Sequence, residues 1–242
     1  MRRLDIDETQ HERTPHGTFE FPFEVHHDDL SQFVGRQVPS HWHGELEISL
    51  LQKGRALYTL GGGCYPLCAG EGILINANVP HMVTPIESDN VEMLTVIVHP
   101  SLLGGAPGGR IETEFLRPFL GAKSLAAIQL TDEECAFFQK IGMLDADRPF
   151  AYELKIKGLL CEVFYELLVR HQEALCNAQT ASMEDLRRMT LLLETLHAHY
   201  DEPLSLDRLA KTLALSKESC CRFFKRMTGQ TITQYLEDYR VA

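Results

Sequence analysis

The stretch GRQVPSHWHGELEISLLQKG, residues 35–54, decides the fold predicted for the first half of this 242-residue chain. Within it, polar residues stand at every second position, with small or apolar residues between them. The polar residues are His41, His43, Glu45 and Glu47. Because successive side chains of an extended strand point to opposite faces, a single strand would place all four on one face. A polar face of this kind either meets water or lines a ligand cavity inside a small barrel.

Two glycines flank this pattern at positions typical of a known sequence motif. The positions that resemble the first motif of the cupin family are Gly35, His41, His43, Glu47 and Gly54. A second cupin motif is partial, because Gly70 and His81 keep its spacing while asparagines replace its proline and glycine. The resemblance implies a jelly-roll β-barrel. Short apolar runs separated by Gly, Pro and Asn between residues 19 and 99 predict the same antiparallel architecture.

The polar face supplies a candidate ligand set. With His81 it offers three imidazoles and one carboxylate, which suit Zn, Fe, Mn or Ni. The four candidate metal ligands are His41, His43, Glu47 and His81. The same groups can instead hydrogen-bond to one another and form the polar wall of an effector pocket, together with Glu45. Both interpretations stay open, and no cofactor is certain from the sequence.

The periodicity becomes helical after the barrel. Thr131 and Glu134 predict a capping box for a helix that runs to about residue 144. Pro149 is expected to open a longer helix that ends near residue 171. Its wide apolar stripe consists of Ile156, Leu159, Leu160, Val163, Phe164, Leu167 and Leu168. Such a stripe predicts burial either against the β-domain and a partner subunit, or against two surfaces of one chain.

A second informative stretch is SLDRLAKTLALSKESCCRFFKRMTG, residues 205–229. It predicts two short helices joined by a turn at Ala214 and Leu215, with Ser205 and Ser216 as N-caps. The apolar stripe expected on the first helix is Leu206, Leu209, Ala210 and Leu213. The inward stripe expected on the second helix is Cys220, Phe223, Phe224 and Met227. A further helix, at residues 183–200, should pack beneath this pair with Leu186, Met189, Leu193 and Leu196 inward.

The opposite face of the second helix is polar and basic. It carries Glu218, Cys221, Arg222 and Lys225. Between residues 205 and 230 six basic residues oppose two acidic ones, although the whole chain carries −11. From residue 183 on, nine basic residues balance nine acidic ones, so the acidity lies in the first 182 residues. A basic island in an acidic protein predicts a phosphate-binding surface, whereas spacing alone also allows a plain helical hairpin.

This segment resembles the first helix-turn-helix of the AraC/XylS transcription regulators. The residues that carry the resemblance are Pro203, Leu204, Ser205, Leu206, Leu209, Ala210, Ser216, Arg222, Phe224, Lys225, Gly229, Tyr235, Leu236, Arg240 and Ala242. Ala214 departs from it, since glycine is usual in this turn, and Cys220 replaces a core leucine. The resemblance also implies a linker helix, which would start at residues 232–240, and a second helix-turn-helix. The sequence ends after the first, so we expect weaker DNA binding than by a chain with both.

The second helix of the motif suits the DNA major groove. We expect Arg222 to read a guanine, with Glu218 and Cys221 beside it. The residues expected to hold phosphates are Ser216, Lys217, Lys225 and Arg226.

The composition limits the remaining possibilities. No run of 18 apolar residues exists and no apolar signal sequence begins the chain, so neither membrane span nor export is expected. Seven cysteines without framework spacing favour a reduced, cytoplasmic compartment. Residues 1–13 are polar and are expected to be poorly ordered.

The predicted class is α+β: a cupin barrel at residues 1–125, a helical dimerisation segment at 126–177, a linker at 177–182 and a partial all-α DNA-binding domain at 183–242. The predicted function is a homodimeric, ligand-responsive transcription regulator that binds double-stranded DNA and a small polar metabolite, and is not an enzyme. The alternative is a metal-dependent cupin enzyme, a dioxygenase or isomerase, with a helical tail.

Overall fold

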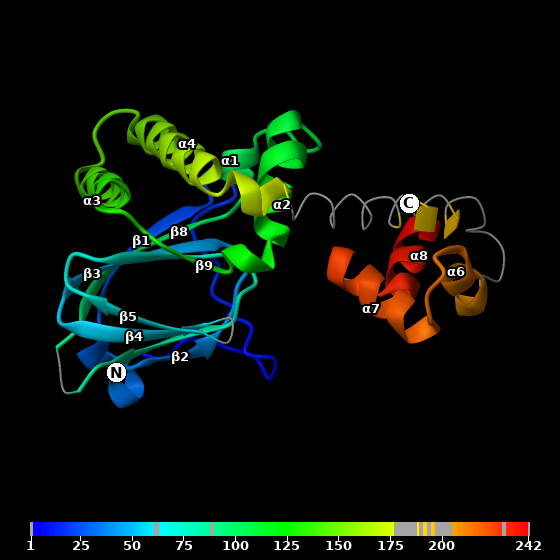
Figure 1. The fold of residues 1–242 in the computed structure, drawn as a ribbon, viewed down its shortest axis with the longest axis horizontal. Helices are drawn as coiled ribbons and strands as arrows, with labels where there is room; N and C mark the ends of the chain where they lie inside the picture. The colour runs from blue at the N-terminus through cyan, green and yellow to red at the C-terminus, as the bar shows by residue number, and fades with distance from the viewer. Residues whose placement is uncertain are drawn as a thin grey trace. The chain divides into compact units, whose positions relative to one another are not determined.

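A computed structural model describes residues 2–60, 63–87, 90–176, 188, 191–192, 195–196, 205–228 and 231–241 (Figure 1). The chain forms two compact units, Met1–Ala178 and Gln179–Ala242. The first contains two antiparallel sheets and the second is helical, which confirms the α+β class. The predicted linker at residues 177–182 lies outside the described residues. None of the helices in the described part has the length and apolar character needed to span a membrane.

Two sheets face each other in the first unit. The five-stranded sheet has the order β1-β8-β3-β6-β9 and the four-stranded sheet the order β2-β7-β4-β5. The strands of the first sheet are β1 (Phe23–Asp29), β8 (Glu92–Val98), β3 (Leu46–Lys53), β6 (Gly72–Ile75) and β9 (Ala127–Gln129). Those of the second are β2 (Val38–His41), β7 (His81–Pro85), β4 (Arg55–Leu60) and β5 (Gly63–Cys68). β4 and β5 form a hairpin, in which Leu60 pairs with Gly63 and Arg55 with Cys68.

Helices cover the outer face of the five-stranded sheet (Figure 1). They are α1 (Ser101–Gly104), α2 (Arg117–Gly121), α3 (Asp132–Asp147) and α4 (Tyr152–Arg170). The first unit also contains short helical segments at η1 (Leu30–Gln32), η2 (Val34–Arg36), η3 (Glu112–Leu116) and η4 (Lys123–Leu125). The capping box of Thr131 and Glu134 is confirmed at the start of α3. Glu134 also binds Arg170 at 2.8 Å, which ties the start of α3 to the end of α4.

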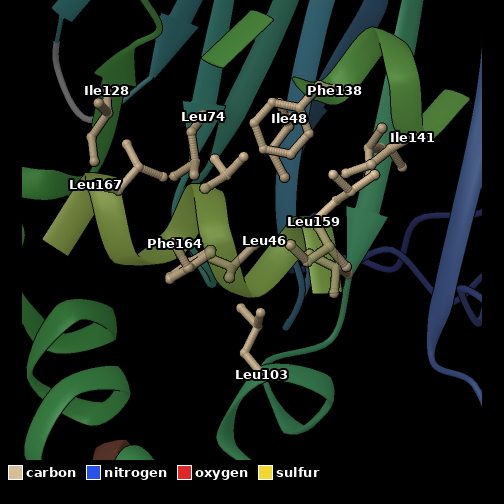
Figure 2. Close-up of a cluster of buried hydrophobic side chains, with 14 of the residues drawn as sticks. Leu46, Ile48, Leu74, Leu103, Ile128, Phe138, Ile141, Leu159, Phe164 and Leu167 are labelled. Carbon is tan, nitrogen blue, oxygen red and sulfur yellow. The ribbon is translucent and has the colours of Figure 1, made fainter. Parts of the chain in front are cut away.

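The main apolar cluster lies between this sheet and the helices. Figure 2 shows Leu46, Ile48 and Leu74 pointing toward Phe138 and other side chains of α3 and α4. A second apolar cluster fills part of the space between the two sheets, around Tyr58 and Phe33. The predicted stripe on α4 is buried in the main cluster except for Leu168, which is half-buried.

Three features of the first unit differ from those predicted. α4 begins at Tyr152, since Ala151 before it has a left-handed φ of 60° that interrupts the helix after Pro149. β9 extends the five-stranded sheet past residue 125, so the barrel and the helical segment belong to one compact unit. The N-terminal residues are ordered, contrary to expectation: Arg2 pairs with buried Asp28, and the amide of Glu12 donates to the Trp42 carbonyl.

The second unit contains the helix-turn-helix as α6 (Leu206–Thr212) and α7 (Lys217–Thr228), followed by α8 (Ile232–Val241). Ser205 caps α6, and the Ser216 hydroxyl accepts from the Ser219 amide at the start of α7. Ala214 takes the turn with φ +53°, the left-handed conformation that glycine adopts without strain. The buried residues are Leu192, Leu196, Leu209, Ala210, Leu213, Cys220, Phe223, Phe224, Ile232 and Leu236.

Leu206 was expected inward but is 41% exposed, because it is the first residue of α6. Of the residues expected inward from the helix at 183–200, Leu196 is buried, whereas Leu186, Met189 and Leu193 lie outside the described residues. The side chain of Met227 also lies outside them.

Candidate functional site

The four predicted metal ligands meet between the two sheets. His41 on β2 lies directly opposite His81 on β7 in the four-stranded sheet. Glu47 comes from β3 in the facing sheet, and His43 from the segment between β2 and β3. The prediction of one continuous strand is therefore wrong, because the chain breaks at residues 42–45 to cross from one sheet to the other. The side chains still converge because both strands turn them toward the same interior.

The cluster is compact and buried. One carboxylate oxygen of Glu47, Oε2, lies 3.2 Å from Nε2 of His43 and 3.2 Å from Nε2 of His81. The rings of His41 and His81 are 4.2 Å apart. One potential ligand atom from each of the four residues lies within 4.8 Å of the other three. This spacing is compatible with coordination of one ion by all four residues.

The second nitrogen of each imidazole faces an oxygen atom. Nδ1 of His41 lies 2.9 Å from the Pro39 carbonyl oxygen, and Nδ1 of His81 lies 2.9 Å from the Val79 carbonyl oxygen. A carbonyl can only accept, so both Nδ1 atoms donate, and in the neutral tautomer of each ring Nε2 is the nitrogen that can bind a metal. Nδ1 of His43 lies 3.3 Å from Glu45 Oε2. In metal sites, hydrogen bonds from the second nitrogen to an oxygen atom orient the imidazole ligands. The sequence did not reveal these contacts.

Charge is unevenly distributed in the cluster. Burial opposes protonation of His43, but Glu45 and Glu47 raise its pKa to about 10. Burial and the neighbouring His81 lower the pKa of His41 to about 4. Burial would raise the pKa of Glu47, yet His81 and His43 hold it well below its usual value. Without a metal the cluster therefore contains an ionised carboxylate, a charged His43 and a neutral His41.

The sequence analysis missed two residues of this site, Glu12 and His16. The Glu12 carboxylate is buried and its Oε2 lies 3.6 Å from Nε2 of His41 and 3.4 Å from Nε2 of His16. Backbone hydrogen bonds from Glu12 to Trp42 and from Trp42 to Gln10 hold this segment in place. The segment has no hydrophobic periodicity, so no local pattern indicated that it is folded against the barrel.

Polar groups also line the neighbouring wall of the interior. The register aligns Glu24, Ile97 and Glu47 across β1, β8 and β3, and places His26, Thr95 and Ser49 in the next row. Ser49 donates to Glu47 at 3.0 Å. Among the described side chains, Thr95 Oγ1 is buried here without a hydrogen-bond partner, while Nε2 of His16 and Nδ1 of His43 face carboxylate oxygens at 3.4 and 3.3 Å. The interior therefore has polar atoms available for a bound ligand.

The predicted DNA-contacting face lies on α7. Arg222, Lys225 and Glu218 are exposed, Cys221 is half-buried, and Phe224 is fully buried, as expected. Nη2 of Arg222 lies 3.4 Å from the Ser219 hydroxyl, near the N-terminal end of the helix.

The predicted phosphate contacts on this face differ in their surroundings. Lys217 binds Asp207 of α6 at 2.8 Å, which offsets part of its charge. The Ser216 hydroxyl is already used as the cap. The side chain of Arg226 lies outside the described residues.

Comparisons with known proteins agree with this architecture. Residues 30–138 match the family described as the AraC-like ligand binding domain. The "Uncharacterized HTH-type transcriptional regulator YdeC" of Bacillus subtilis (strain 168) is 27% identical over 100% of this chain and 83% of its own length. The "HTH-type transcriptional activator RhaR" of Escherichia coli (strain K12) is 26% identical over 83% of this chain and 70% of its own.

A solved structure, an apo variant of ToxT from Vibrio cholerae strain SCE256, aligns over 92% of this chain and 98% of its own, at 10% identity and a TM-score of 0.46. The named relatives are regulators, which favours the predicted regulator over the cupin enzyme.

Proposed function

Since this chain is a transcription regulator of the AraC type, we propose that it binds duplex DNA through the outward face of α7 and responds to a small polar metabolite in the barrel. The observation that carries the DNA-binding part is the orientation of α7. Phe223 and Phe224 are buried on one side, and Arg222 and Lys225 are exposed on the other. A helix anchored by one face can present the other to the major groove.

The roles proposed on α7 follow from chemistry and position. Arginine can form two hydrogen bonds to guanine, and glutamate can accept from the cytosine amino group, which suits Arg222 and Glu218. Lys225 lies farther along the helix and would contact phosphate. Lys217 would contribute less than a free lysine, because Asp207 already pairs with it.

The test compares two substitutions on DNA selected by the full chain from a random pool. Arg222→Ala should lose about 1–3 kcal/mol of discrimination at one base pair. Lys225→Ala should weaken binding to all sequences alike and reduce its salt dependence. Arg110→Ala is the matched control, since this exposed arginine pairs with Glu114 in the first unit. Fluorescence anisotropy measures each affinity, and equal losses on all sequences for Arg222→Ala would contradict base reading.

We propose further that His41, His43, Glu47 and His81 hold one divalent transition metal. The donor set, its compact geometry and the fixed Nδ1 protons of His41 and His81 support this. His43 would have to release its proton, since a metal binds neutral imidazole. An ion that takes more than four ligands would offer a further coordination position to a polar oxygen of the effector. Without a metal, the same residues would contact the effector directly, with Glu45 beside them.

Dimerisation is proposed through α4. Opposite its buried stripe, this helix carries a second stripe of small or apolar residues: Leu154, Gly158, Cys161, Tyr165 and Val169. Leu154 is 74% exposed, Tyr165 62% and Val169 52%. Spacings of four, three, four and four residues keep these side chains on one face, as in paired helices.

The oligomeric state tests this proposal. Analytical ultracentrifugation of the full chain should show a dimer at micromolar concentration and a monomer for Tyr165→Glu, because the charge would be desolvated in the interface. Glu162→Ala, on the same helix beside the stripe, should leave the dimer intact. A monomeric wild-type chain would contradict the proposal.

A further inference from the structure

A second group of metal-ligating side chains lies next to the first. Nδ1 of His16 is 3.3 Å from Glu24 Oε2, and Nε2 of His26 is 3.5 Å from the same oxygen. One ligand atom from each of these three residues lies within 4.8 Å of the other two. None of the three falls within residues 30–138, the part that matches the ligand-binding family.

Local structure explains why these residues meet. Glu24 and His26 are two positions apart on β1, so both point to the same face, while Phe23 packs in the outer apolar cluster. His16 approaches because the chain turns at Gly17, which has φ +76°. A Cβ at Gly17 would lie 2.4 Å from the Phe23 nitrogen, so no larger residue fits this turn unchanged. The glycine thereby holds His16 against the edge strand.

The spacing suits a small transition-metal ion. Metal–ligand bonds of about 2.0–2.1 Å place tetrahedral ligand atoms about 3.3–3.4 Å apart, close to the 3.3 and 3.5 Å that separate Glu24 Oε2 from the two imidazole nitrogens. Two imidazoles with one carboxylate favour Zn²⁺ and similar ions over Ca²⁺ or Mg²⁺, which prefer oxygen ligands. The His16 side chain is 4% exposed, whereas His26 and Glu24 are 21% and 36% exposed, which leaves a route for an ion.

The surroundings orient His16 for this role. Its Nε2 has no hydrogen-bond partner among the described residues but lies 3.4 Å from Glu12 Oε2. The Glu12 carboxylate favours a proton on that nitrogen, so Nδ1, which faces Glu24, is the nitrogen that would lose its proton and bind the ion. The same Glu12 oxygen lies 3.6 Å from His41 of the first cluster, and the rings of His16 and His43 are 5.4 Å apart.

The charges allow both clusters to be filled. Two divalent cations close together repel each other unless anionic groups surround them. The carboxylates of Glu24 and Glu47 belong to the two ligand sets, and those of Glu12 and Glu45 lie beside them. Four carboxylates offset the four positive charges of two such ions.

We propose that His16, Glu24 and His26 form a second divalent transition-metal site, with Glu12 as the positioning residue between the two clusters. Three protein ligands leave a coordination position for water or a polar ligand. A bound ion would link the segment before β1 to the barrel wall. This site goes beyond the proposed regulatory function and does not depend on a metal in the first cluster.

The metal content of the full chain tests the proposal. Apo protein is dialysed against Zn²⁺, and bound zinc is measured by elemental analysis for the wild type and for Glu24→Gln, His26→Gln and His81→Gln. Glu24→Gln and His26→Gln keep the size of the side chain but should each bind one ion fewer than the wild type. His27→Gln is the matched control, because His27 is the exposed neighbour on the other face of β1 and should not change the count.

The outcomes separate the two sites. Two ions in the wild type and one each in His26→Gln and His81→Gln would support both. One ion in the wild type, none in His26→Gln and one in His81→Gln would support the second site and refute the first. Equal zinc content in the wild type, Glu24→Gln and His26→Gln would overturn the second site. Fluorescence of Trp42, the single tryptophan, confirms that each variant is folded in the first unit.

Discussion

The two faces of the five-stranded sheet differ in chemistry although they belong to the same strands: the outer face is apolar, whereas the inner face combines apolar residues with buried polar ones. The outer face carries Leu46, Ile48 and Val96, all fully buried in the apolar cluster with α3 and α4. Figure 2 shows Leu46 and Ile48 in this cluster. The inner face carries Glu47 and Thr95 at alternating positions of β3 and β8. Apolar burial stabilises the fold by about 25 cal/mol per Å², whereas buried polar groups without partners cost free energy. The free energy gained by apolar burial on the outer face can therefore offset the cost of the buried polar groups on the inner face.

This comparison predicts that truncation on the outer face has the largest effect on stability. Phe138 of α3 is fully buried against the sheet. Phe138→Ala should lower the free energy of unfolding by about 3–5 kcal/mol, because it removes apolar contacts and leaves a cavity. Urea unfolding followed by Trp42 fluorescence measures this, since the single tryptophan reports only on the first unit. A loss below about 1 kcal/mol would show that the helices contribute little.

A smaller effect is expected when a hydroxyl is placed on the outer face. Val96 is fully buried in the apolar cluster, so Val96→Thr buries a hydroxyl among apolar side chains. The free energy of unfolding should fall by about 1–3 kcal/mol. The same urea titration measures it. A stability equal to that of the wild type would mean that the outer face accepts a buried hydroxyl without cost, contrary to the difference proposed between the two faces.

The reverse substitution at the adjacent residue should have the smallest effect. The Thr95 hydroxyl is buried without a partner on the inner face, among the described residues. Thr95→Val keeps the shape and removes this cost, so stability should change by less than about 0.5 kcal/mol or increase. The residue next to it on the chain thus provides the matched control for Val96→Thr. A clear loss would show that Thr95 has a bonding partner in solution, such as bound water.

The sequence predicted most of the fold but only part of the site. The alternation at residues 41–47 and the position of His81 were enough to identify the first cluster, because the spacing of the cupin motif encodes it. The prediction that one strand carries His41, His43 and Glu47 was wrong, since these residues come from both sheets and the segment between them. Glu12 and His16 were missed because their segment carries no periodic pattern. Glu24 and His26 alternate on β1, but nothing local showed that their face is the interior.

The sequence by itself determined the short-range features, because these depend on neighbouring residues: the capping box of Thr131 and Glu134, the cap at Ser216, the inward Phe224 and the outward Arg222. The tertiary structure alone decided which polar groups meet. His16, Glu24, His41 and His81 are brought together by strand pairing and by the turn at Gly17. Pairing between distant strands depends on contacts across the whole sheet, and no local pattern carries that information.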